Sequence, residues 1–375
     1  MDYVYAVAGD KTLARVLALL CGLGCLTAGL GRCAADPILI SLPGFLPTLT
    51  AGAATNGQVP LTLTGEASVQ YIIESSPDLL NWSPVATNTD TNSIRQIALP
   101  AATDVTFYRA SRKPIALFTY AMAAQGYINL VGNGLTASSW NSYDPNQSAN
   151  GTYNGYTGTN ADFASVAGVV NFGNHTVEGS LYLGTHATFV SSLGNLTGFV
   201  YTNANLAFPD VSLPNVTWLP APFTNSLHAF ITSGFYSVTD GYPVSVEPGI
   251  VVNLYVTPPV NFSPSSINIK GGTTNAGTLT VYQSQGSAGF PGGSSMTVGR
   301  PQNFIYLGLP GVTSLSFPGS QTVIGLIYAP EAIVSFNDGG LSLGLIGSCV
   351  VSNATVLGHY NLHFDESVRT NGPVR

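Results

Sequence analysis

Charged residues are scarce in this sequence. Asp, Glu, Lys and Arg make up 8% of the 375 residues, against about a quarter of an ordinary soluble domain. Basic side chains are the rarest, because Lys270 and Arg300 are the only ones between residues 114 and 368. Nucleic-acid binding needs clustered Lys and Arg that replace the counterions of the phosphates. The composition therefore excludes nucleic acid as a partner.

Long apolar runs are also absent after the N-terminus. The one candidate, residues 16–26, follows Lys11 and Arg15 and precedes the small residues 33–35. This order is typical of a signal peptide, and the run is shorter than the roughly 20 residues that a membrane span requires. We expect residues 1–35 to be a signal peptide. The protein is then secreted, periplasmic or at the cell surface, with no transmembrane segment beyond that peptide.

Cysteine is nearly missing from the expected mature chain. Three of the four cysteines lie within residues 1–35, and only Cys349 remains after cleavage. A single cysteine excludes an intramolecular disulfide. Cys349 lies in the apolar run 345–351, which predicts a buried strand with a packed, unreactive thiol.

Motifs for catalysis or cofactor binding are missing as well. There is no Gly-rich phosphate loop and no nucleophile elbow, so we expect no cofactor and no catalytic residue. His359 and His363, with Asp365 nearby, would suit a metal on a helix. The alternating apolar residues around them favour a strand instead, on which they lie about 13 Å apart. We therefore expect no metal site. Carboxylates converging from stacked strands stay open as an enzymatic alternative.

The chain has 42 glycines, and some of them recur at a fixed spacing. Residues 179–182 (Gly-Ser-Leu-Tyr) recur 19 residues later as Gly-Phe-Val-Tyr, and residues 325–327 (Gly-Leu-Ile) recur 19 residues later unchanged. Repeats of this length cannot bury their apolar faces alone and stack on their neighbours. The pattern predicts an all-β fold whose main part, residues 115–368, is a right-handed parallel β-helix (solenoid) of about eleven coils.

The segment before residue 115 has a different pattern. Residues 36–56 are a Pro/Gly/Ala-rich lead-in, and residues 57–112 contain short alternating strands that predict a small β-sandwich. The pattern of residues 71–82, followed by Phe-Tyr-Arg at 107–109, resembles a fibronectin type III-like module of secreted bacterial proteins. The resemblance implies that Trp82 and Tyr108 are core residues. Residues 111–114 are the expected linker.

Three pieces of the longer part carry a second resemblance. They are residues 128–134 with 141–144, residues 323–332 (which include Ile-Tyr-Ala-Pro), and residues 363–367 (His-Phe-Asp-Glu-Ser). Together they resemble an uncharacterised bacterial extracytoplasmic Gly-rich β-solenoid domain that is associated with pili or surfaces. The resemblance implies a surface role and supplies no catalytic residues. We expect a Pro-rich loop or edge excursion at 208–248 and a disordered tail at 369–375.

Aromatic residues in polar tracts are the remaining candidates for function. Trp140, Trp218 and Tyr143 lie among Asn, Ser and Pro, where exposed rings suit contact with carbohydrate or protein. The sequence thus predicts an exported structural or adhesive protein without catalytic activity, whose partner is an extracellular glycan or a surface protein. The alternative is a carbohydrate-active β-helix enzyme, either a polysaccharide lyase or a glycoside hydrolase.

Overall fold

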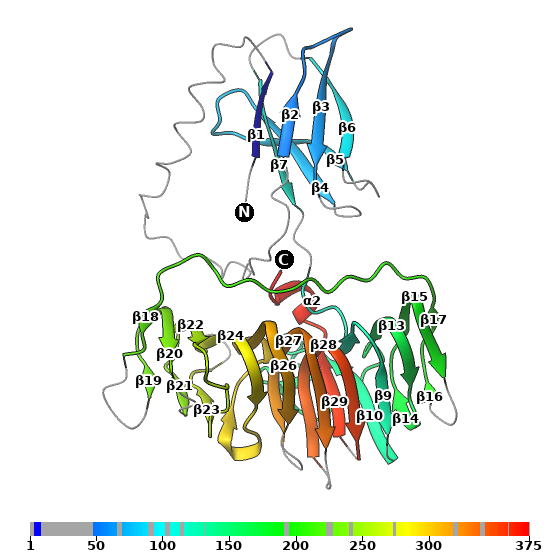
Figure 1. The fold of residues 1–375 in the computed structure, drawn as a ribbon, viewed down its shortest axis with the longest axis vertical. Coiled ribbons are helices and arrows are strands. Elements are labelled where there is room, and N and C mark those ends of the chain that lie inside the picture. The colour runs from blue at the N-terminus through cyan, green and yellow to red at the C-terminus, as the bar shows by residue number, and fades with distance from the viewer. Residues whose placement is uncertain are drawn as a thin grey trace. The chain divides into compact units, whose positions relative to one another are not determined.

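The computed structural model shows a chain of two compact units that are built almost entirely of strands (Figure 1). The first unit comprises Met1–Leu39 and Pro43–Ile115, and the second comprises Ile40–Leu42 and Ala116–Arg375. The structure describes residues 4–8, 48–65, 70–88, 94–101, 106–112, 116–131, 133–190, 195–222, 228–239, 243–272, 275–317, 322–337, 342–358 and 360–374.

The first unit has two antiparallel sheets. One has the order β1 (Val4–Ala8), β7 (Thr106–Arg112), β4 (Tyr71–Ser76), β5 (Ser83–Asn88), and the other β2 (Thr48–Ala51), β3 (Gln58–Thr64), β6 (Ile94–Pro100). Their core contains Leu61, Tyr71, Ile73 and Tyr108, so the expected core role of Tyr108 is confirmed. Trp82 is half-buried, with the Arg109 guanidinium 4.3 Å from its ring centre.

Two strands of this unit lie before residue 57, the expected start of the sandwich. β2 lies in the predicted lead-in, where it pairs with β3. β1 lies inside the predicted signal peptide, and its residues pair with β7 from Val4–Ala110 to Ala8–Thr106. The apolar run, the cleavage site and the rest of residues 9–47 lie outside the described residues. Removal of residues 1–35 would leave β7 at the edge of a three-stranded sheet.

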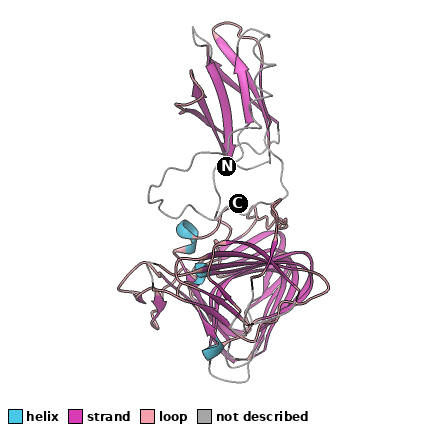
Figure 2. Ribbon diagram, turned by 90° about the vertical axis from the view of Figure 1, so that its left-hand side faces the viewer, coloured by secondary structure: helices cyan, strands magenta, loops and turns pink. Residues whose placement is uncertain are grey.

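The second unit is dominated by one sheet of 16 strands, all paired in parallel. Seen from the side, its strands lie on several faces around an interior (Figure 2). Its strands are β8 (Met122–Ala124), β9 (Ile128–Val131), β10 (Asn133–Trp140), β13 (Phe163–Asn171), β14 (Asn174–Val177), β15 (Leu181–Val190), β16 (Asn195–Leu196), β17 (Val200–Tyr201), β18 (Leu219–Pro220), β20 (Gly234–Val238), β22 (Val251–Val256), β24 (Thr278–Gly289), β26 (Phe304–Phe317), β27 (Val323–Asn337), β28 (Ser342–Leu357) and β29 (Tyr360–Asp365).

Smaller elements complete the unit. A second parallel sheet has the order β19 (Ala229–Phe230), β21 (Val244–Val246), β23 (Ile267–Ile269), β25 (Met296–Thr297). A hairpin joins β11 (Ser148–Ala149) to β12 (Thr152–Tyr153). The helical turns are η1 (Gly293–Ser295), η2 (Pro301–Asn303) and α2 (Val368–Asn371).

Equivalent residues of successive strands form a continuous row, which we call the first ladder. Its pairs run in the order Leu219, Tyr236, Leu254, Val281, Tyr306, Ile327, Cys349, Met122, Phe163, Leu181, Val200. All but the two end residues are buried. Each buried side chain contributes roughly 1.5–3 kcal/mol of apolar burial. Cys349 is confirmed as a packed thiol, and burial raises its pKa.

The chain does not follow the ladder from one end to the other. It enters in the middle at β8, proceeds through β13 and β15 to β17, and then crosses to β18 at the opposite end. From there it returns through β20, β22, β24, β26 and β27 to β28 and β29. Because β29 pairs with β10, the last strand closes the stack against the first strands of the same unit.

Residues 202–218 make the crossing, and we call them the crossing segment. In Figure 1 it runs in green above the strands from β17 to β18. The ten steps of the ladder span roughly 48 Å at the usual strand separation, and a chain of this length reaches at most roughly 60 Å. The segment must therefore be nearly extended, a conformation that Pro209 and Pro214 favour.

The crossing segment covers an apolar outer surface. The neighbours of the ladder residues, such as Tyr282, Leu307, Tyr328 and Val350, are buried although they lie on the opposite side of their strands. Tyr328 donates a hydrogen bond to the Pro209 carbonyl (2.9 Å), and Gln125 donates one to the Phe208 carbonyl (2.8 Å). Cover on both faces explains why these strands are apolar without alternation.

Only one of the two 19-residue glycine spacings matches the pairing register of the strands. The first spacing is the structural register, because Leu181 pairs with Val200 and the Gly198 N–H donates to the Gly179 carbonyl (2.8 Å). The second spacing is not, because Gly325 pairs with Gly347 rather than with Gly344. Gly344 instead has φ +68° and lies against the Asn361 backbone. Both sites still bring neighbouring backbones close together.

The expectation of a disordered tail is wrong. Residues 368–371 form α2, and Leu117 donates a hydrogen bond to the Pro373 carbonyl (2.9 Å), so the described part of the 369–375 tail is ordered by packing. The Pro-rich region 208–248 is only partly a loop, because its described residues after 218 form β18 to β21, and β18 lies at an edge of the large sheet. Its later prolines occur at strand edges and turns, where a missing N–H is tolerated.

Candidate functional site

The three sequence-selected aromatic residues lie in different environments. Trp140 has no exposed surface; it packs edge-on against Tyr153 (5.4 Å) and its indole N–H donates to the His363 carbonyl (3.3 Å). The expectation of a ligand contact is therefore wrong for Trp140, which is a core residue. A hairpin contributed by residues 148–153 supplies the cover that the sequence pattern did not predict.

Trp218 and Tyr143 keep access to solvent. Trp218 is half-buried and contacts the rings of Phe235, Tyr255 and Tyr282 at 5.4–5.7 Å. Tyr143 is 51% exposed, and the Arg300 guanidinium lies 3.8 Å from its ring centre. The structure thus brings none of the three residues together.

The polar motifs near the two ends of the unit meet where β29 pairs with β10, and we call this cluster the clasp. Asp365 accepts hydrogen bonds from the backbone N–H groups of Ser142 (3.0 Å) and Ser367 (3.1 Å). Glu366 accepts from Ser139 (2.6 Å) and Asn160 (3.0 Å). The motifs 141–144 and 363–367 therefore join the last strand, β29, to β10.

The clasp also holds two buried titratable groups. His363 is bonded to the Ser138 hydroxyl (3.0 Å) and is stacked on Tyr153 (4.2 Å). Desolvation lowers the pKa of His363 to about 4. Burial raises the pKa of Asp365, and its hydrogen bonds offset this only in part. Both side chains lie under the 141–160 segment, so the geometry supports a structural joint rather than a reaction centre.

Acidification is expected to weaken this joint. The unfolded imidazole has a pKa of about 6.5, so as the pH falls the unfolded state binds the His363 proton first. The unfolding free energy of the second unit should drop by about 2 kcal/mol between about pH 7.5 and pH 5. Urea titrations at both pH values measure it. His363→Gln should flatten the dependence.

Asp365 acts in the opposite direction, because its raised pKa lets the folded state take up a proton before the unfolded state does. Asp365→Asn should therefore steepen the loss on acidification. A profile unaffected by His363→Gln would contradict the assignment.

A different surface has the features of a binding face. On the outer side of the strands, paired residues form a second row, which we call the polar row. Its members run in the order Gly289, Ser316, Ser335, Thr355, Asn129, Asn171. It carries hydroxyl and amide groups and no charge, and it crosses six successive strand positions, from β24 to β13.

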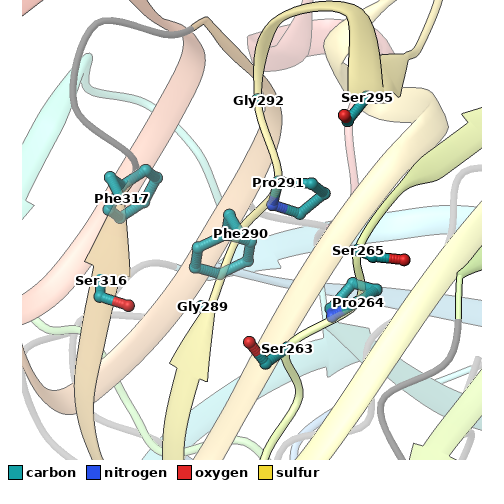
Figure 3. A pocket seen from close by; sticks show the side chains of 10 residues that line it. All are labelled: Ser263, Pro264, Ser265, Gly289, Phe290, Pro291, Gly292, Ser295, Ser316 and Phe317. Atoms are coloured by element: carbon teal, nitrogen blue, oxygen red, sulfur yellow. The ribbon is translucent and has the colours of Figure 1, made fainter.

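A hollow lies at each end of the polar row. The first, of about 390 Å³, includes Gly289, Phe290, Ser316 and Phe317 in its lining. Figure 3 shows the Phe290 ring near its centre, between Ser316 and Ser263. The second, of about 690 Å³, includes Tyr127, Asn129, Asn171 and Asn353. No charged residue lines either hollow.

Between the two hollows, the polar row consists of Ser335 and Thr355. Three strand-to-strand steps of the polar row separate Ser316 from Asn129, a distance of roughly 14 Å. In the second hollow Asn171 donates to Asn129 (3.1 Å), while Tyr127 is 39% exposed beside them. An aromatic ring next to amides and hydroxyls can contact both the apolar and the polar groups of a neutral ligand.

Side chains that could hold a metal do not gather in the described part of the chain. No set of three His, Cys, Asp or Glu side chains there could hold a metal ion. Two of the acids are ion-paired instead, Asp162 with Arg369 (2.8 Å) and Glu247 with Lys270 (2.6 Å). His359 and Asp338 lie outside the described residues. No helix in the described segments has the length and apolar character to cross a bilayer.

The comparisons with known proteins identify one similarity. A family model described as a domain of unknown function, DUF7305, matches residues 231–371. This range runs from just before β20 to α2 and includes β26, β27, β28 and the last strand of the clasp. Neither a curated protein nor a solved structure matches the chain.

Proposed function

We propose that this protein is an exported, adhesive β-solenoid that binds a neutral extracellular glycan along the polar row. The proposal takes the second unit as a right-handed parallel β-helix and the first as a fibronectin type III-like module behind a signal peptide. Parallel pairing with offsets of 17–27 residues between consecutive strands supports the helical winding. The uncharged row with a hollow at each end is the observation that carries the binding role.

The chemistry of the row favours a neutral polysaccharide over an ionic partner. An acidic polymer would need Lys or Arg, and neither occurs in the row or in its hollows. Regularly spaced hydroxyls and amides suit a ligand that is itself a repeating chain of hydroxyl groups. The parallel strands hold these groups in fixed positions, so little side-chain entropy is lost on binding.

Glycan arrays with the purified full chain test the proposal, scored for both binding and cleavage. Tyr127→Ala is expected to weaken binding of a neutral glycan at least fivefold, roughly the contribution of one aromatic contact. The matched control is Tyr156→Ala, because Tyr156 is also 39% exposed but lies away from the polar row. The Asn129→Ala/Asn171→Ala double variant should act like Tyr127→Ala.

Three outcomes would contradict the proposal. One is the absence of binding to any neutral glycan. Another is equal loss of binding in the Tyr127 and Tyr156 variants. The third is cleavage of a bound polysaccharide, which would support the carbohydrate-active enzyme instead.

A further inference from the structure

The two ends of the first ladder are exposed, and both present apolar side chains. Val200 is 42% exposed at one end, where its neighbour Phe199 is 72% exposed. Leu219 is 54% exposed at the other end. Apolar side chains on an unpaired strand edge are a template for pairing with another chain. The two edges differ, however, in whether their backbones can accept a new strand.

The β18 edge is blocked. The Ala221 N–H donates to the Ser237 carbonyl of β20 (3.1 Å). Because successive residues of a strand direct their backbone groups to alternate sides, the nitrogen of Pro220 faces the open edge. Proline has no N–H, so this position cannot donate a hydrogen bond to an added strand, and proline is a common device against edge pairing.

The β17 edge is open. The Leu181 N–H donates to the Phe199 carbonyl (2.8 Å), which directs the N–H and C=O of Val200 away from β15. Within the described residues no strand pairs with β17 on that side, and none pairs beyond the second half of β15, residues 186–190. Neither segment contains a proline.

We propose that this end, residues 186–190 and 195–201, is the interface for a second copy of the chain. Two copies related by a two-fold axis present their β17 edges antiparallel, so each Val200 can exchange backbone hydrogen bonds with its partner strand. Neither segment contains Asp, Glu, Lys or Arg, whereas the whole chain has a formal net charge of −7. Two molecules therefore meet here without like-charge contacts.

The blocked β18 edge determines the size of the assembly. Head-to-tail stacking would join β17 of one copy to β18 of the next and would grow into a filament. Pro220 prevents that contact, so association ends at a closed dimer. This inference does not rest on glycan binding, because it uses the backbone edge of β17, whereas the polar row ends on β13 at Asn171, the pairing partner of Val190.

Sedimentation velocity of the full chain, in a dilution series up to about 100 µM, tests the proposal. The wild type should reach twice the chain mass. Val200→Lys should weaken dimerisation at least about a hundredfold, because like charges then meet across the axis. The matched control is Leu219→Lys, which changes an even more exposed apolar residue (54%, against 42% for Val200) at the blocked end and should leave the dimer intact.

Val200→Pro gives a second readout, because it removes the edge N–H without adding charge and should also yield monomers. Circular dichroism melts verify folding, and Val190→Lys, on the same end, replaces any variant that fails to fold. A wild type that stays monomeric overturns the proposal. It is equally overturned by filaments, or by a dimer that survives in folded Val200→Lys.

Discussion

Replacement of Gly347 with valine is expected to unfold the second unit or to destabilise it by at least about 4 kcal/mol. Gly347 pairs with Gly325, and a Cβ at position 347 would overlap the Gly325 carbonyl. Its φ of +141° also disfavours an L side chain. Neither backbone can move without breaking strand pairs on both sides, so strain and overpacking add. The whole stability of a domain is only about 5–15 kcal/mol.

The matched control for this variant is Gly272→Val. A Cβ at position 272 would meet no atom within 4 Å, so the free energy should change by less than about 0.5 kcal/mol. Tryptophan fluorescence in urea separates the units when Trp82 is replaced by Phe, because the remaining Trp140 and Trp218 both belong to the second unit. Equal midpoints for the two valine variants would contradict the close backbone approach.

Trp140→Ala is expected to cost about 3–5 kcal/mol, the usual range for a fully buried aromatic residue. The change leaves a cavity beside Tyr153 and removes the hydrogen bond to the His363 carbonyl. The melting temperature of the second unit should fall by roughly 10 °C. Differential scanning calorimetry measures the shift.

Tyr143→Ala provides the comparison, because Tyr143 is half-exposed and its loss should leave the melting temperature nearly unchanged. Glycan binding by folded Trp140→Ala should match the wild type, since the ring contacts no solvent. A stable Trp140→Ala variant with lost binding would restore the ligand-contact interpretation of this residue.

Local patterns in the sequence predicted much of the fold. The apolar run around Cys349 did become a buried strand, and the repeat of 179–182 at 198–201 gave the correct register. The spacing of Gly325 failed because bulges shift the register between β27 and β28, and a constant period cannot anticipate them. The prediction that Trp140 is an exposed ligand contact was wrong because the polar tract after it folds back as the 148–153 hairpin and covers the ring.

The polar row was less accessible to sequence reasoning. Asn129, Thr355 and Ser316 are far apart in the chain and share no motif, so nothing local marks them as one row. Only their register positions connect them. The alternation of residues 354–357 signals an outward position for Thr355, but not which residue lies beside it.

The sequence by itself determined the all-β character, the scarcity of charged side chains and the close approach of strands at glycine, because each follows from side-chain chemistry and short-range periodicity. Tertiary structure alone decided the order of the stack. The last strand docks on β10 and the crossing segment joins the two ends, since pairing energy depends on matching edges and not on proximity in the chain. That closure placed the motifs 141–144 and 363–367 in one joint.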